Sequence, residues 1–240
     1  MIYYTVSREK NIIYTARFVS LLFTPFYLPL MGLILLFTLS YLALLPIAYR
    51  LQVLAIVYLF TILLPTYAIH FYRKHQGWTL IELGQRERRM VPYVISIVCY
   101  LICVWLLSVM NVFHFVSSIL MAAMLIQIVC AIINVWWKIS THTAAIGGVA
   151  GALFAFSEIF GFNPVWWLCT VFFAAGIMGS ARMILRQHSL AQVVAGFFVG
   201  LLGAALARLF LEGPRAHRTN RTYKTHKTYK THTTYKTYNN

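Results

Sequence analysis

Residues 115–136 read FVSSILMAAMLIQIVCAIINVW, a stretch without a single charged side chain. A run of roughly 20 apolar residues is long enough to cross the hydrocarbon core of a bilayer as a helix. Similar runs recur along the sequence, and we predict spans at 18–40, 51–72, 91–109, 115–136, 142–160, 165–183 and 189–211. The sequence therefore predicts an all-α fold, a polytopic helical membrane bundle. Pro25 and Pro29 interrupt the first run early, which sets the expected number at six to seven transmembrane helices.

The composition divides the chain into two parts. Of all residues, 60% are hydrophobic and only 10% are charged, whereas soluble domains carry about 25% charged residues. We therefore predict that residues 1–212 form a single transmembrane domain. In residues 213–240, the motif Thr222-Tyr223-Lys224-Thr225-His226 recurs with variation. This part is predicted to be a disordered, basic, low-complexity tail. It is either the product of a slipped coding repeat or a segment that touches anionic headgroups.

Acidic residues are scarce, and this limits the chemistry that the protein can perform. There is no aspartate, and the glutamates are Glu9, Glu82, Glu87, Glu158 and Glu212. This composition argues against most dinuclear metal sites and against every Asp-based triad. The cysteines all lie within apolar runs, which favours a packing role over metal binding or disulfides; they are Cys99, Cys103, Cys130 and Cys169. We therefore expect no metal and no other cofactor.

The basic residues near the spans gather on one side of the membrane. With seven spans, the loops that follow spans two, four and six all lie on the same face. These loops contain Arg86, Arg88 and Arg89; then Lys138, Ser140 and His142; then Arg182, Arg186 and His188. The loops that follow spans three and five are nearly free of basic residues. Ionisable groups at membrane depth are costly and usually functional, so this face is the expected site.

The residue types in these loops suit a phosphate group. Ser140 and Thr141 stand at the start of a predicted helix, whose free N–H groups accept a phosphate readily. Arg182 and Arg186 are four residues apart and would share one helical face if the sixth span continues that far. An arginine donates two parallel hydrogen bonds to phosphate oxygens. A neutral histidine can attack phosphorus, and a second, protonated histidine can donate a proton to the leaving alkoxide.

At these residues the chain resembles the type 2 phosphatidic acid phosphatase superfamily of integral membrane lipid phosphate phosphatases. The family's second motif, Pro-Ser-Gly-His, is matched by Ile139-Ser140-Thr141-His142. Its third motif is Ser-Arg, five residues, His, three residues and Asp, and is matched by Ala181-Arg182, His188 and Gln192. Its first motif, Lys, six residues and Arg-Pro, has only a loose counterpart between Gln85 and Pro92. The resemblance predicts a phosphatase-like core at about residues 80–205.

The resemblance implies a role for each matched residue. His188 would be the nucleophile and His142 the general acid. Phosphate would be held by Arg182, by Ser140 with the adjacent Thr141, and by Arg86 and Arg89 of the first motif; we add Lys138 because it is close in sequence. Two residues depart from the family pattern. Thr141 replaces a glycine, and Gln192 replaces the aspartate that orients the nucleophilic histidine. An amide can fix the imidazole tautomer but cannot stabilise its positive charge, so a slower reaction is expected.

The resemblance implies hydrolysis of a phosphate monoester or a pyrophosphate on a lipid such as phosphatidic acid, phosphatidylglycerol phosphate, undecaprenyl pyrophosphate or a lipid A phosphate. A lipid phosphotransferase and a non-enzymatic protein that binds or flips a lipid phosphate remain alternatives. The expected partners are a phosphorylated lipid and the bilayer, not nucleic acid. We expect a multi-pass protein of the cytoplasmic (inner) membrane. Positive loops point the site to the cytoplasm, whereas the basic tail and the bacterial relatives point it to the outer face, which we adopt.

Overall fold

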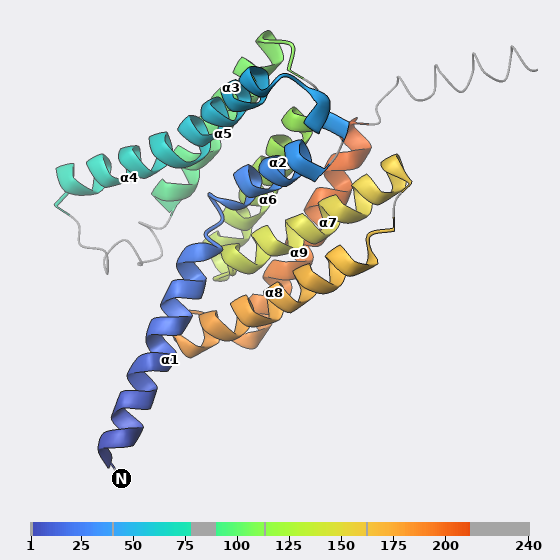
Figure 1. The fold of residues 1–240 in the computed structure, drawn as a ribbon. Helices are drawn as coiled ribbons and strands as arrows, with labels where there is room; N and C mark the ends of the chain where they lie inside the picture. Colours follow the sequence, from blue (N-terminus) through green and yellow to red (C-terminus); the bar gives the residue numbers. More distant parts are fainter. Residues whose placement is uncertain (1, 40, 78–89, 113, 162, 212–240) are drawn as a thin grey trace, which may run out of the picture. The chain divides into compact units, whose positions relative to one another are not determined.

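The computed structural model describes residues 2–39, 41–77, 90–112, 114–161 and 163–211, and these residues form only helices and short connections (Figure 1). The elements in chain order are α1 (Ile2–Leu22), α2 (Leu28–Leu39), the 3₁₀ helix η1 (Tyr41–Leu44), α3 (Ile47–Tyr58), the π-helical turn η2 (Leu59–Leu63), α4 (Leu64–His75), α5 (Met90–Val109), α6 (His114–Trp136), α7 (Thr141–Phe160), α8 (Val165–Ile184) and α9 (Leu190–Leu211). The predicted all-α class is confirmed.

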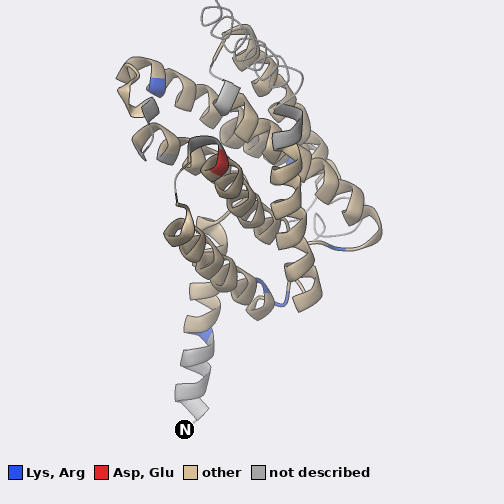
Figure 2. Cartoon of the chain, turned by 90° about the vertical axis from the view of Figure 1, so that its right-hand side faces the viewer, with Lys and Arg blue, Asp and Glu red and all other residues tan. Residues whose placement is uncertain are grey.

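Five helices of the described residues are long and apolar enough to cross a membrane, as expected of a multi-pass membrane protein. They are Ile47–His75, Met90–Val109, Val116–Trp136, Val165–Ile184 and Leu190–Ala207. The first of these runs without interruption through α3, η2 and α4. The predicted span at 142–160 corresponds to the helix α7, which is not among these five, so its crossing of the membrane stays a prediction. Figure 2 shows how few charged side chains the described helices carry.

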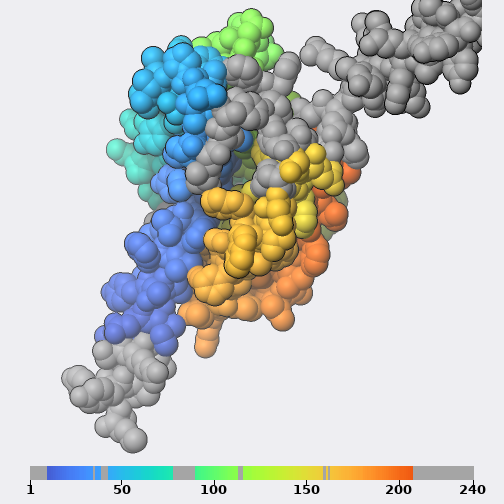
Figure 3. Space-filling model, turned by 45° about the vertical axis from the view of Figure 1, so that its right-hand side comes forward, coloured from blue at the N-terminus to red at the C-terminus, as the bar shows by residue number. Residues whose placement is uncertain are grey.

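The predicted span at 18–40 is wrong as a single helix. The helix α1 ends at Leu22, and α2 begins only at Leu28. Pro25 lies in the connecting turn, where its ring and missing N–H prevent continuation of the helix. The N-terminal half of this region belongs to α1, which packs along α8 (Figure 3). This contact brings Ser20 next to α8, far from its neighbours in sequence.

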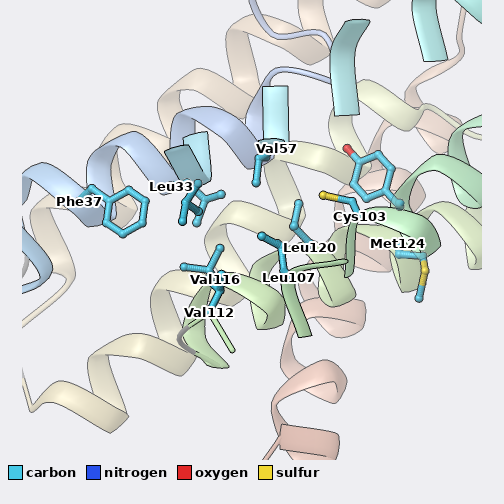
Figure 4. Close-up of a cluster of buried hydrophobic side chains, with 11 residues drawn as sticks. Leu33, Phe37, Val57, Cys103, Leu107, Val112, Val116, Leu120 and Met124 are labelled. Carbon is cyan, nitrogen blue, oxygen red and sulfur yellow. The ribbon is translucent and has the colours of Figure 1, made fainter. Parts of the chain in front are cut away.

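The largest cluster of buried side chains joins α2, α3, α5 and α6 (Figure 4). Leu33, Val57, Leu107 and Leu120 are among its fully buried members. Burying such a side chain contributes about 1.5–3 kcal/mol where the surroundings exclude water. Of the cysteines, Cys99, Cys103 and Cys130 are buried, as expected of packing residues, whereas Cys169 is exposed. The cluster holds α5 and α6 together.

The helices α7 and α9 approach each other through glycines. A Cβ atom at Gly147 would collide with the backbone carbonyl of Phe197, and one at Gly200 with that of Ala144. Small residues permit this close approach of two backbones within a membrane, and the glycine cluster in the sequence indicates such a surface. A backbone hydrogen bond of 3.4 Å from Ser140 N to Gln192 O joins the same two segments.

Gly200→Ala is expected to destabilise the protein by about 1–3 kcal/mol or more, as overpacking of a filled interior does. The added Cβ would also lie 2.6 Å from the amide nitrogen of Gly148, so both backbones would have to separate. The measurement is the thermal unfolding midpoint of purified protein in detergent. Gly176→Ala is the matched control, because nothing lies within 4 Å of a Cβ at that position. Equal midpoints for the two variants would contradict the close packing.

The chain divides into two units, Met1–Ala207 and Arg208–Asn240. The predicted tail, residues 213–240, lies outside the described residues, and its disorder stays a prediction. The basic residues Arg86 and Arg89 of the loosely matched motif lie outside them as well. The site is therefore built from the first unit alone.

Candidate functional site

A cavity of about 1050 Å³ lies among α2, α5, α6 and α7 and reaches residues of α8 and of the α8–α9 connection. Its walls consist mostly of apolar and small side chains, for example Ile126, Ala145 and Val149. Ionisable side chains line it as well, namely Lys138, His142, Arg182 and His188. These residues lie where α6 and α8 end and α7 and α9 begin. Residues 46 positions apart in sequence, His142 and His188, thus contribute to one pocket, as the parity of the spans predicts.

The N-terminus of α7 is capped by Ser140. Its backbone is extended, with φ −85° and ψ 104°, and its Oγ accepts a hydrogen bond from Thr143 N at 3.5 Å. Thr143 Oγ1 in turn donates to Ser140 O at 3.0 Å. Ser140 is 0% exposed and does not line the cavity, so its hydroxyl serves the helix rather than the pocket. Its predicted contact with phosphate through the hydroxyl therefore finds no support in the geometry.

Thr141 and His142 occupy the first two positions of α7 and line the cavity. Their backbone N–H groups belong to the first turn, where no intrahelical acceptor exists. The positive end of the helix dipole also lies there and favours an anion. The structure thus places the backbone N–H groups of Thr141 and His142, rather than the hydroxyl of Ser140, at the cavity.

His188 is oriented by Gln192. The Nδ1 atom of His188 lies 3.2 Å from Oε1 of Gln192, one turn further along the chain in α9. Because an amide oxygen only accepts, Nδ1 carries the proton and Nε2 keeps its lone pair. The same Oε1 accepts from Ser189 N at 3.2 Å, which fixes the amide in this orientation. Gln192 therefore holds the tautomer in which Nε2 carries no proton.

Arg182 is held by α1. Its Nη1 donates to Ser20 Oγ at 2.8 Å, a bond between residues 162 positions apart. Its Nε is buried and has no partner among the described residues. An unpaired guanidinium N–H beside a cavity is costly unless a ligand accepts from it. Nothing in the sequence around Ser20 indicates this contact, because the pairing arises only when α1 packs on α8.

His142 is the second histidine of the pocket. Its Nδ1 is buried without a partner among the described residues. The ring lies within electrostatic range of both Arg182 and His188, which places the three side chains in one group. In the described part of the chain, one nitrogen of His142 and one of Arg182 are thus buried without a hydrogen-bond partner, and both residues line the cavity.

Other basic residues divide into those at the cavity and those away from it. Lys138 lines the cavity, as predicted, and so does Gln187, which the sequence analysis did not single out. Arg186 does not share a helical face with Arg182, because the condition for it, a helix that continues to Arg186, is not met. The helix α8 ends at Ile184, and Arg186 has a φ of 51°, in the left-handed region. Arg186 is exposed and is not part of the cavity wall.

The comparison with protein families returns one match. Residues 136–215 match the PAP2 superfamily. No curated protein and no solved structure matches the chain. The matched segment contains Lys138, His142, Arg182, His188 and Gln192. These are the residues that carry the motif resemblance, and the structure gathers the first four of them around one cavity. The match to the PAP2 superfamily is thus confined to residues 136–215, about one third of the chain.

Proposed function

We propose that this protein hydrolyses a phosphate monoester or a terminal pyrophosphate bond on a membrane lipid, without a metal ion, through a phosphohistidine on His188. The match of residues 136–215 to the PAP2 superfamily supports phosphatase activity on phosphate esters. One observation carries the finer proposal. His142, Arg182 and His188 converge at the end of a largely apolar cavity inside a membrane protein. A small soluble phosphate ester would make few contacts with the apolar wall of that cavity, whereas the chain of a lipid would fill it.

The first step is attack of His188 Nε2 on phosphorus. The hydrogen bond from Nδ1 to Gln192 Oε1 keeps the lone pair on Nε2, as described above. A P–N bond forms as the P–O bond to the lipid breaks. Arg182, Lys138 and the first N–H groups of α7 stabilise the charge on the phosphoryl oxygens. Such electrostatic stabilisation is usually the largest contribution to phosphoryl transfer.

His142 then donates a proton to the oxygen that leaves with the lipid. It lies within electrostatic range of Arg182 and His188. The freed lipid alcohol, or lipid monophosphate in the case of a pyrophosphate, departs into the bilayer. Water attacks the phosphohistidine, breaks the P–N bond and releases inorganic phosphate. His142 takes up the proton of that water, which returns both histidines to their starting states.

A second function is favoured by Gln192. An amide at this position orients His188 but does not neutralise the positive charge that the ring acquires when it attacks. A site with slow or absent turnover still binds a phosphate through Arg182 and the start of α7. The alternatives are therefore transfer of the phosphoryl group to a lipid or sugar hydroxyl, and binding or flipping of a lipid phosphate without chemistry.

The proposed function is tested by phosphate release from purified protein in detergent, with a panel of lipid phosphates and one soluble phosphate ester. We expect phosphate release from at least one lipid at the same rate with and without EDTA. Release from the soluble ester should be slower by a factor of about ten or more. If phosphate release stopped in EDTA and resumed when Mg²⁺ was added, the metal-independent scheme would be disproved. Transfer of the phosphoryl group from the lipid to an added alcohol, with no release of inorganic phosphate, would instead establish a transferase.

A further inference from the structure

Three polar side chains line the cavity away from the histidines and have no assigned role. They are Tyr100 on α5 and Gln127 and Asn134 on α6. The Oη of Tyr100, the Oε1 of Gln127 and the Oδ1 of Asn134 are all buried without a hydrogen-bond partner among the described residues. Tyr100 is 0% and Asn134 3% exposed. Together they form what we call the deep polar group.

Leaving these atoms unpaired is energetically costly. A buried polar group without a partner is destabilising, and most buried polar atoms in proteins are paired. Other buried hydroxyls on these helices follow the common solution of bonding to the preceding turn. On α5, Ser96 Oγ donates to Pro92 O at 2.7 Å. Thr61 in η2 shows the same pattern, with its Oγ1 donating to Val57 O at 2.8 Å. The deep polar group does not, which indicates that its partner comes from the contents of the cavity.

Two members of the deep polar group, Asn134 and Gln127, lie at different heights along α6. Asn134 is near the end of α6, close in sequence to Lys138 and hence to the basic end. Gln127 is seven residues earlier, about 10 Å further along the helix axis. Tyr100 faces the same cavity from the neighbouring helix α5. A lipid with its phosphate at His188 would pass these atoms with its linkage and its chain.

The available atoms define what that lipid must offer. The amide oxygens of Gln127 and Asn134 accept hydrogen bonds, and the Tyr100 hydroxyl both donates and accepts. A plain hydrocarbon or polyprenyl chain satisfies none of them. We infer that the cavity selects a phosphorylated lipid that carries a hydrogen-bond donor, a hydroxyl or an amide N–H, in its linkage or chain region. This inference rests on the proposed function for the position of the phosphate.

The selectivity should be measurable because sites built around hydrogen bonds discriminate strongly against analogues that lack the polar group. Such discrimination reaches about 10⁴–10⁵-fold when the site is fully enclosed. One added hydrogen bond to otherwise unpaired atoms is worth about 1.4 kcal/mol or more, which corresponds to a tenfold change in affinity. We therefore expect about tenfold tighter binding of a hydroxylated lipid over its unhydroxylated parent.

The experiment measures equilibrium binding rather than turnover, with the full-length His188→Ala protein in detergent. The probes are phosphatidic acid with one hydroxyl on an acyl chain, prepared as a series of chain positions, and the same lipid without the hydroxyl. The expected result is tighter binding of at least one hydroxylated probe, and loss of this preference in Tyr100→Phe and in Asn134→Leu. The matched control is Ser96→Ala, which removes a cavity hydroxyl that is already bonded to the backbone and should leave the preference intact.

Two results would overturn the inference. One is equal binding of every hydroxylated probe and its parent, which would mean that ordered water occupies the deep polar group. The other is a preference that survives in both Tyr100→Phe and Asn134→Leu. Should Asn134→Leu fail to fold, Gln127→Leu replaces it. Phosphate release by the unmodified protein is measured separately. Preference without release disproves only the hydrolase, and release without preference disproves only this inference.

Discussion

Replacement of His188 by alanine should lower the rate of phosphate release by about 10⁴-fold or more, the range seen when a covalent nucleophile is removed from a hydrolase. The reason is that the variant has no atom to form the P–N bond, while Arg182 and the start of α7 still bind the phosphate. The Michaelis constant should therefore change far less than the turnover number. The measurement is steady-state phosphate release from the best lipid of the panel.

A direct probe of the intermediate strengthens this test. Wild-type protein mixed with labelled lipid phosphate and quenched in alkali should carry a label that is stable in alkali and lost in acid, as expected of a phosphohistidine. The label should be absent from His188→Ala. The matched control is His75→Ala, because His75 lies at the end of α4 with its ring against Phe71 and does not line the cavity. A label that persists in His188→Ala would place the nucleophile elsewhere.

Giving His188 a carboxylate partner should accelerate the reaction. Gln192→Glu keeps the size of the side chain and its acceptor 3.2 Å from Nδ1, and adds a negative charge beside the ring. In a serine protease triad, the change from carboxylate to amide lowers turnover by about 10⁴-fold. We expect Gln192→Glu to raise turnover by about 10–10³-fold, because the geometry here was formed around an amide. Gln192→Asp supplies the carboxylate of the family motif at a shorter reach.

The comparison variant for this prediction is Gln192→Met, which keeps the length of the side chain but removes the acceptor. It should lower turnover, since Nδ1 and Ser189 N would both lose their shared partner. The rates of all variants are measured with one lipid at saturating concentration. Unchanged lipid binding with no turnover in wild type, Gln192→Glu and Gln192→Asp would favour the binding or flipping protein over the hydrolase.

The spans and the pairing of the two histidines could be predicted from sequence, because apolar length and the parity of spans depend on local patterns alone. The break at Pro25 shows where such patterns are insufficient: the same apolar run supplies parts of two helices that pack against different neighbours. The arginine spacing failed for a related reason. A four-residue interval implies a shared face only while the helix lasts, and α8 ends at Ile184.

The contacts that complete the site could not be predicted, because they join distant parts of the chain. Ser20 reaches Arg182 only through the packing of α1 on α8. The hydroxyl of Ser140 could be assigned to a helix cap or to a ligand from sequence, and only the fold distinguishes them. Tyr100, Gln127 and Asn134 resemble ordinary polar residues of membrane helices until the cavity beside them is seen. The roles proposed for the site residues remain predictions for the experiments above.

The bond between Ser20 and Arg182 crosses the boundary of the family segment, which begins only at residue 136. The segment that matches the family thus contains both histidines and Arg182, but not the serine that accepts a hydrogen bond from the arginine. We expect a chimera in which an unrelated helix replaces α1 to keep both histidines but to bind phosphate less tightly, because Arg182 loses its bond to Ser20. Substitutions in the N-terminal helix should accordingly change the affinity for substrate through Arg182. Neither histidine would have to be altered.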